Sequence, residues 1–174
     1  MARTDVLRAY RHREEFDVCS DFEFWARIAA NHKLATLPEV LVPRRIHAGQ
    51  LTQEKAARTE GQRLAIYAAQ LHLLGVSFTD SDFKRHLLLR SMRKRGFRPD
   101  LIYVEWAESW LLRLQAANHR ADCYPEPAFS QLLGHFWLKV WWDAMCNEAW
   151  TAWAHFCRSP LCTLAVSHIL VSLL

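Results

Sequence analysis

The side chains with the clearest chemical potential lie in two short segments near the start of the sequence. The first, Ser20–Trp25 (Ser-Asp-Phe-Glu-Phe-Trp), places the carboxylate of Asp21 at the start of a predicted helix. The second, residues 44–50 (Arg-Arg-Ile-His-Ala-Gly-Gln), carries His47 close to two arginines. A fixed carboxylate can accept a proton, a guanidinium can bind phosphate, and an imidazole can bind phosphate or help to hold a metal.

The local pattern also offers a purely structural interpretation of the first segment. Ser20 and Glu23 have the spacing of a capping box, in which each side chain bonds the backbone amide of the other, and we expect this role for Glu23. Asp21 would then only favour the positive end of the helix dipole, a contribution of about 0.3–1 kcal/mol. We expect Trp25 to pack in the core, with contact to a sugar ring as the alternative.

In their order along the chain, these segments resemble the acceptor-side half of the family-2 glycosyltransferases. The resemblance rests on the acidic helix start at Ser20–Trp25, the Leu-Pro-Glu-Val-Leu stretch at 37–41 and the Arg-Ile-His-Ala-Gly-Gln element at 45–50. Enzymes of this family move a sugar from a nucleotide diphosphate to an acceptor hydroxyl. The resemblance implies that Asp21 is the base that takes the hydroxyl proton. Position 20 departs from the family, which usually has an acidic residue or Gln where this chain has Ser20.

The same resemblance implies donor-side roles for His47, Arg45 and the neighbouring Arg44. His47 would help to complete a Mg²⁺ or Mn²⁺ site or contact the diphosphate, and the arginines would neutralise phosphate. A single histidine cannot hold a metal, so the family's Asp-x-Asp motif and its nucleotide-binding half should lie upstream. The one Asp-x-Asp in this sequence, at residues 80–82, is predicted to start a helix. A solvated loop with a hydrogen-bonded histidine is the alternative for residues 44–50.

Composition indicates a globular, mainly helical protein. Hydrophobic residues make up 51% and charged residues 23% of the 174, which excludes a disordered chain, and five glycines and six prolines favour helices over turn-rich β folds. The net charge of +4 permits an anionic partner without requiring one. The five cysteines lack C-x-x-C spacing and predict reduced, mostly buried thiols. A zinc site built from Cys146, His155, Cys157 and Cys162 matches no common zinc spacing.

The sequence also predicts the order of the elements. Residues 35–46 are predicted to be extended and to lie at a sheet edge, because proline at 38 and 43 cannot donate to a ladder. Helices are expected at residues 58–74, 80–95, 101–118, 127–144 and 148–158, with a last one opening at 159–160. The tryptophan pairs 106/110, 137/141 and 150/153 have helical spacing and are expected in the core.

Two segments raise the question of lipid or nucleic-acid contact. Residues 84–98 alternate basic and apolar side chains, which is typical of a solvated amphipathic helix; an anionic membrane surface and nucleic acid are the alternatives. Nucleic acid is disfavoured because the segment lacks the repeated aromatic interleaving typical of single-strand binders, with Phe97 as its one Phe, Tyr or Trp. The apolar run 161–174 is too short and too interrupted to span a bilayer, so we expect a packed helix or a membrane-surface contact.

Together these features predict a mainly α fold. Residues 1–52 would be a small α/β remnant of a GT-A-type nucleotide-sugar transferase fold, and residues 53–174 a helical C-terminal region. We expect a glycosyltransferase fragment that is inactive alone, whose full-length family uses a nucleotide sugar and a carbohydrate acceptor. The alternative is a helical adaptor module that pairs with a separate donor-binding chain at an exposed edge near Val40–Ile46. The expected location is cytoplasmic, with peripheral membrane association as a variant.

Overall fold

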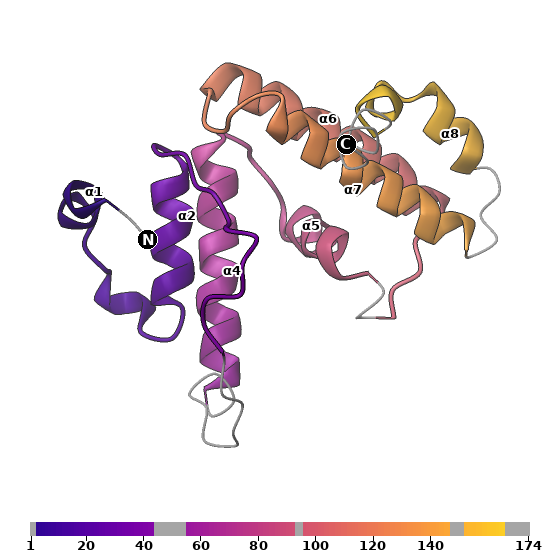
Figure 1. Ribbon diagram of the computed structural model, residues 1–174. Helices are drawn as coiled ribbons and strands as arrows, with labels where there is room; N and C mark the ends of the chain where they lie inside the picture. Colours follow the sequence, from indigo (N-terminus) through magenta and orange to yellow (C-terminus); the bar gives the residue numbers. More distant parts are fainter. Residues whose placement is uncertain (1–2, 44–54, 93–95, 147–151, 166–174) are drawn as a thin grey trace. The chain divides into compact units, whose positions relative to one another are not determined.

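The computed structural model describes residues 3–43, 55–92, 96–146 and 152–165. Within these ranges the chain is helical and contains no strand, so the mainly α class is confirmed and the expected α/β element is not shown. The elements in chain order are α1 (Thr4–Ala9), the 3-10 turn η1 (Glu14–Phe16), α2 (Ser20–Ala29), α4 (Ala56–Leu73), α5 (Asp80–Ser91), α6 (Leu101–Ala121), α7 (Ala128–Met145) and α8 (Ala152–Arg158) (Figure 1).

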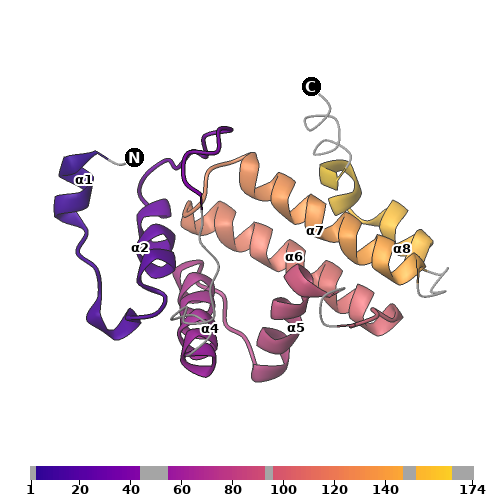
Figure 2. The same ribbon diagram turned by 60° about the horizontal axis from the view of Figure 1, so that its bottom comes forward.

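The chain divides into two compact units, Met1–Leu73 and Leu74–Leu174. The predicted boundary between residues 52 and 53 lies outside the described residues. In the first unit, α2 and α4 lie side by side in both ribbon views (Figures 1 and 2). Phe24 and Ile28 of α2, one turn apart, are buried against this neighbour together with Ile66 of α4.

The extended stretch after α2 has no strand partner. Residues 33–43 are exposed throughout and carry no strand, although strand formation was predicted from residue 35 onward. The physical reason is that a strand needs a neighbour with which to exchange backbone hydrogen bonds, and the described residues provide none. Large apolar side chains are therefore left in solvent, at Leu34, Leu37, Val40, Leu41 and Val42.

The second unit is built on α6 and α7, which lie next to one another in both views, with α8 against them (Figure 2). Trp110 and Leu111 of α6 and Trp137 and Val140 of α7 are almost fully buried. The short connection between the two helices is closed by Asn118. Its buried amide donates to the carbonyl of Tyr124 at 3.0 Å and accepts the Tyr124 N–H at 2.8 Å.

Local caps set the starts of α5 and α6. Thr79 and Asp82 form a capping box at α5, and Asp100 accepts the N–H of Tyr103 at 2.8 Å at α6. The Asp82 carboxylate also accepts the indole N–H of Trp106 at 2.9 Å, and this hydrogen bond lowers the pKa of Asp82. The prediction that the Asp-x-Asp sequence opens a helix is confirmed.

The cysteines agree only in part with the prediction of reduced, mostly buried thiols. All five are free thiols, but Cys19 alone is buried, whereas Cys146 and Cys157 are exposed. The expectation of mostly buried thiols was therefore wrong. The two exposed thiols lie near the ends of α7 and α8, on sides of these helices that face solvent.

Two helical glycines in opposite environments provide a matched test of packing. A Cβ on Gly134 of α7 would lie 2.5 Å from the carbonyl carbon of Leu164, whereas a Cβ on Gly61 of α4 would meet nothing within 4 Å. Gly134→Ala should destabilise the protein by about 1–3 kcal/mol through overpacking, and Gly61→Ala should stabilise it by about 0.5–1 kcal/mol. Urea unfolding followed by circular dichroism measures both changes. Equal effects in the two variants would contradict the close approach at Gly134.

A half-buried histidine predicts a specific loss of stability in acid. Trp110 donates its indole N–H to Nδ1 of His86 at 3.0 Å, and burial lowers the pKa of His86 from 6.5 to about 4. Between these values the unfolded chain binds more protons, so the free energy of unfolding should fall as the pH drops from 6.5 to 4, by up to about 3 kcal/mol. Denaturant unfolding at several pH values should show this loss reduced in His86→Asn, which keeps an acceptor but cannot titrate in this range.

Candidate functional site

Asp21 lies in the first turn of α2 and faces solvent. Its Oδ1 accepts the backbone N–H of Phe22 at 2.7 Å, a purely local contact. Trp25 follows one helical turn later, on the same face, and is 41% exposed. The expectation that Trp25 packs in the core was wrong, because α2 instead turns Phe24 and Ile28 inward. A carboxylate and an indole therefore share an open helix face.

The start of α2 is held in place by Gln62 of α4. The Oε1 of Gln62 accepts the N–H groups of Val18 at 3.2 Å and Cys19 at 3.0 Å. Its Nε2 donates to the carbonyl of Glu15 at 2.7 Å and to the carboxylate of Asp17 at 2.8 Å. This side chain thus uses its full hydrogen-bonding capacity on the turn between η1 and α2. These hydrogen bonds of Gln62 therefore fix the start of α2, where Asp21 lies.

Charged side chains lie around Gln62, but their ion pairs add little to stability. Asp17 pairs with Arg58 at 3.0 Å and with Lys55 at 3.7 Å. The hydrogen bond from Gln62, and then the two cations, lower the pKa of Asp17. Because these side chains are exposed, water screens their attraction and each ion pair adds little to stability. Their effect is to keep the Asp17 carboxylate ionised as an acceptor for Gln62.

Glu23 points to the other side of α2, where its side chain is only 7% exposed. Its carboxylate accepts Nε of Arg27 at 2.8 Å and Nη2 at 3.1 Å, and Arg13 approaches to 3.5 Å. The predicted capping box was wrong: Ser20 lies inside the helix, and the capping residue, Cys19, makes no side-chain cap. The spacing of Glu23 and Arg27, four residues apart, was the sequence signal for this ion pair.

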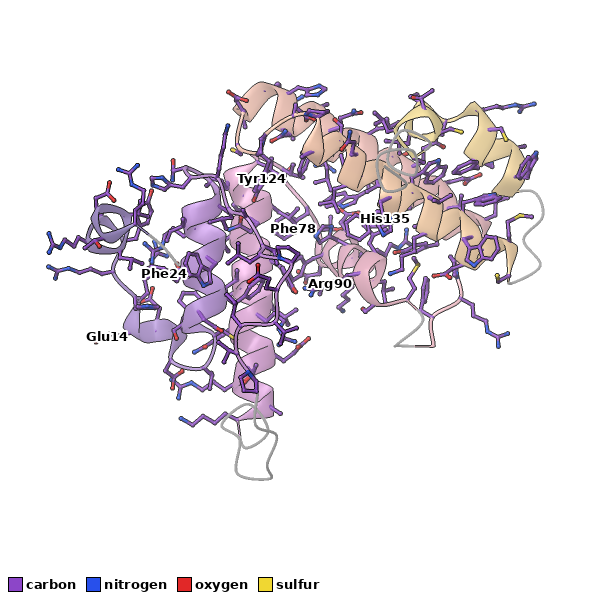
Figure 3. The ribbon with its side chains drawn as sticks, in the orientation of Figure 1. Glu14, Phe24, Phe78, Arg90, Tyr124 and His135 are labelled. Atoms are coloured by element: carbon purple, nitrogen blue, oxygen red, sulfur yellow. The ribbon has the colours of Figure 1, made fainter. Side chains whose placement is uncertain are left out.

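Arg27 ties the N-terminal segment to α2. Its guanidinium lies 5.5 Å from the ring centroid of Tyr10 and donates to the carbonyl of Arg11 at 2.7 Å. The hydrogen bonds to Glu23 raise its pKa, which keeps it charged at any physiological pH. Phe24, labelled in Figure 3, belongs to the same cluster: the Arg27 guanidinium lies 6.0 Å from its ring centroid, and its ring stacks on His12 with centroids 4.4 Å apart.

A pocket of about 250 Å³ opens beside this ion pair. It is lined by Arg13, Phe16, Glu23, Arg27, Ala30, Asn31, Ile66, Ala69, Gln70 and Leu73. Asp21 does not line it, because two residues along a helix correspond to a rotation of about 200°. The carboxylate inside the pocket already has two arginine partners. The pocket can hold a small molecule, but its carboxylate is not poised as a base.

The predicted donor-side residues Arg44, Arg45 and His47 lie outside the described residues. Within the described ranges, no group of three histidine, cysteine, aspartate or glutamate residues could hold a metal ion. This search covers the cysteine and histidine set considered for zinc. In the same ranges, no helix combines the length and the apolar character needed to cross a bilayer.

No protein-family model matches the chain, and neither a curated protein nor a solved structure matches it. The resemblance to family-2 glycosyltransferases therefore rests on the residues of the motif and stays a prediction.

The buried ion pair gives a direct test of how this unit is held together. Glu23→Gln keeps the shape of the side chain but removes the counter-charge of Arg27, which is 24% exposed, and of Arg13, which is 52% exposed, so we expect a loss of about 2 kcal/mol in the free energy of unfolding. The matched control is Glu60→Gln, because Glu60 pairs with Arg63 at 3.7 Å on the exposed surface. That change should cost less than about 1 kcal/mol. Similar losses in both variants, measured by urea unfolding, would refute the assigned role of Glu23.

Proposed function

We propose that this chain is the acceptor-side part of a GT-A-type family-2 glycosyltransferase, with Asp21 as the base. The observation that supports this most directly is the position of Asp21 on an exposed helix end that Gln62 fixes from a second helix. In the described residues its carboxylate accepts only a local N–H. A carboxylate held in this way can meet an acceptor hydroxyl and take its proton as the new bond forms.

Trp25 would serve the same substrate. Its exposed indole, one turn from Asp21, offers a flat apolar surface to the face of a sugar ring. A hydroxyl of a ring stacked there would come within reach of the Asp21 carboxylate. The helix would thus orient the acceptor with one side chain and deprotonate it with the other.

The donor would be bound by a separate half of the enzyme. In this proposal Arg45 and His47 would bind the diphosphate of the nucleotide sugar, where a Mg²⁺ or Mn²⁺ ion would supply further positive charge. The described residues contain no set of ligands that fits such an ion. No step is therefore assigned to the metal, and the chain alone is expected to be inactive.

A second candidate function is a helical adaptor that docks on a donor-binding chain. The exposed stretch after α2 favours it: Val40 is 95% and Val42 79% exposed, while Leu41 on the opposite face is 61% exposed. Apolar residues on both faces are typical of a strand buried on both sides in a parallel α/β sheet. Such a segment can add to the sheet edge of a partner. The two candidates differ in whether Asp21 contacts a substrate.

Saccharide binding tests the proposed role of the Asp21–Trp25 face. Saturation-transfer NMR with a panel of mono- and oligosaccharides should detect an acceptor whose affinity falls about tenfold in Trp25→Ala, through loss of stacking. Asp21→Asn should weaken binding less, because an amide still bonds a hydroxyl. Trp153→Ala, an exposed tryptophan of the second unit, is the matched control and should leave binding unchanged.

Activity measurements complete this test. Incubation of the pure chain with nucleotide sugars and Mn²⁺ should yield neither hydrolysis nor transfer, and turnover abolished by Asp21→Asn would refute the expected inactivity. If no saccharide binds, or if Trp25→Ala and Asp21→Asn both leave binding unchanged, the acceptor-side function is wrong and the adaptor function is favoured.

A further inference from the structure

We propose that an exposed aromatic surface on α7 and α8 binds an anionic lipid surface. This tryptophan surface consists of Trp141, Trp142 and Trp153. Trp142 is 52% and Trp153 55% exposed, and Trp141 lies between them with ring centroids 6.1 Å and 5.5 Å away. Trp142 and Trp153 each contact the ring of Trp141 and each leave about half of their area in water, so the three indoles form an apolar patch that a partner can cover.

The tryptophan surface is rigidly supported from below. Trp141 stacks on Phe156 with ring centroids 4.6 Å apart, and Phe156 in turn stacks on Trp137 at 6.2 Å. Trp137 is fully buried and Phe156 nearly so. A continuous aromatic layer therefore runs from the core of the second unit to its surface. The exposed indoles are held in position before any partner arrives, which reduces the entropy cost of binding.

An open hollow adjoins the tryptophan surface on α7. It measures about 480 Å³ and is lined by His135, Leu138, Lys139, Trp141 and Trp142. His135, labelled in Figure 3, marks its position on the helix. Lys139 is engaged here, because its ammonium donates to the carbonyls of Leu89 and Arg90 at the end of α5. The hollow thus combines apolar walls with a few polar groups, as expected where acyl chains and headgroups meet.

Charge selects an anionic partner for this face. Among the described residues from 128 to 165, Asp143 is the one acidic residue, and it is buried. Helices α7 and α8 therefore present no exposed carboxylate of their own among these residues, and Arg158 is exposed. The nearest carboxylates are Glu105 and Glu108 of α6, 3.7 Å and 3.9 Å from His155 on α8. Indole rings favour the headgroup level of a bilayer, where the apolar ring is covered and the N–H stays hydrated. Since no described helix can cross a bilayer, the contact would lie on the membrane surface.

Vesicle binding by the full chain tests the proposal. In co-sedimentation, vesicles of phosphatidylcholine with phosphatidylglycerol should retain the protein, and vesicles of phosphatidylcholine alone should retain less. Trp142→Ala combined with Trp153→Ala should weaken retention more than tenfold. Acyl chains that carry bromine should quench tryptophan fluorescence in the wild type and much less in the double variant. The matched control is Trp25→Ala, which removes an exposed tryptophan of the first unit and should leave retention unchanged.

Other partners of the tryptophan surface would give different results in these experiments. An unaltered thermal unfolding midpoint would confirm that the double variant is folded, as expected for side chains that are more than half exposed. Equal retention of wild type and double variant, or no retention of either, would overturn the proposal. So would sedimentation of the wild type as a dimer that the double variant converts to a monomer, because the occupant would then be a second copy of the chain. None of these outcomes depends on the role of Asp21.

Discussion

The carboxamide of Gln62 is the interaction on which the first unit depends. The start of α2 has no side-chain cap of its own, so the backbone groups of the preceding turn need partners from elsewhere. Gln62 supplies them from α4, more than forty residues along the chain. The second unit solves the same problem locally, with Thr79 and Asp100 as caps within their own helices. The starts of α5 and α6 are therefore set by local side chains, whereas that of α2 is not.

This contrast explains what the sequence could predict. The starts of α5 and α6 were predicted to the residue, because each cap lies within three residues of its partner. The predicted helix end at residue 74 lies one residue from the observed end of α4 at Leu73, and Gly75 follows with φ of 69°. Glu23 could bond an amide three residues before it or Arg27 four residues after it. Glu23 pairs with Arg27 because the Glu23 side chain is buried against α4 and because Arg13 approaches it. Neither contact can be predicted from the local sequence.

The candidate site was predictable in part for the same reason. The sequence predicted Asp21 at a helix start, but which face of α2 is covered depends on α4, and the prediction for Trp25 was therefore wrong.

The stretch from Leu34 to Val42 leaves large apolar side chains in water. Covering one large apolar side chain contributes about 1.5–3 kcal/mol, so a segment with five of them in water gains substantially from any partner that covers it. A second polypeptide segment that paired with this stretch, as the adaptor function proposes, would cover these side chains.

Catalysis by Asp21 would require the same event. A carboxylate in bulk water is strongly solvated, and it must lose part of that hydration shell before it can act efficiently on an acceptor hydroxyl. Excluding water also strengthens its interaction with the reacting groups, because the local dielectric constant falls. A donor-binding half that paired with residues 37–42 would be joined to Asp21 through the α2 helix and the short stretch that follows it. Its docking could therefore bury the exposed apolar side chains and close the space around the carboxylate in a single step. On this argument the inactivity expected of the chain alone and the exposure of its apolar segment have one cause.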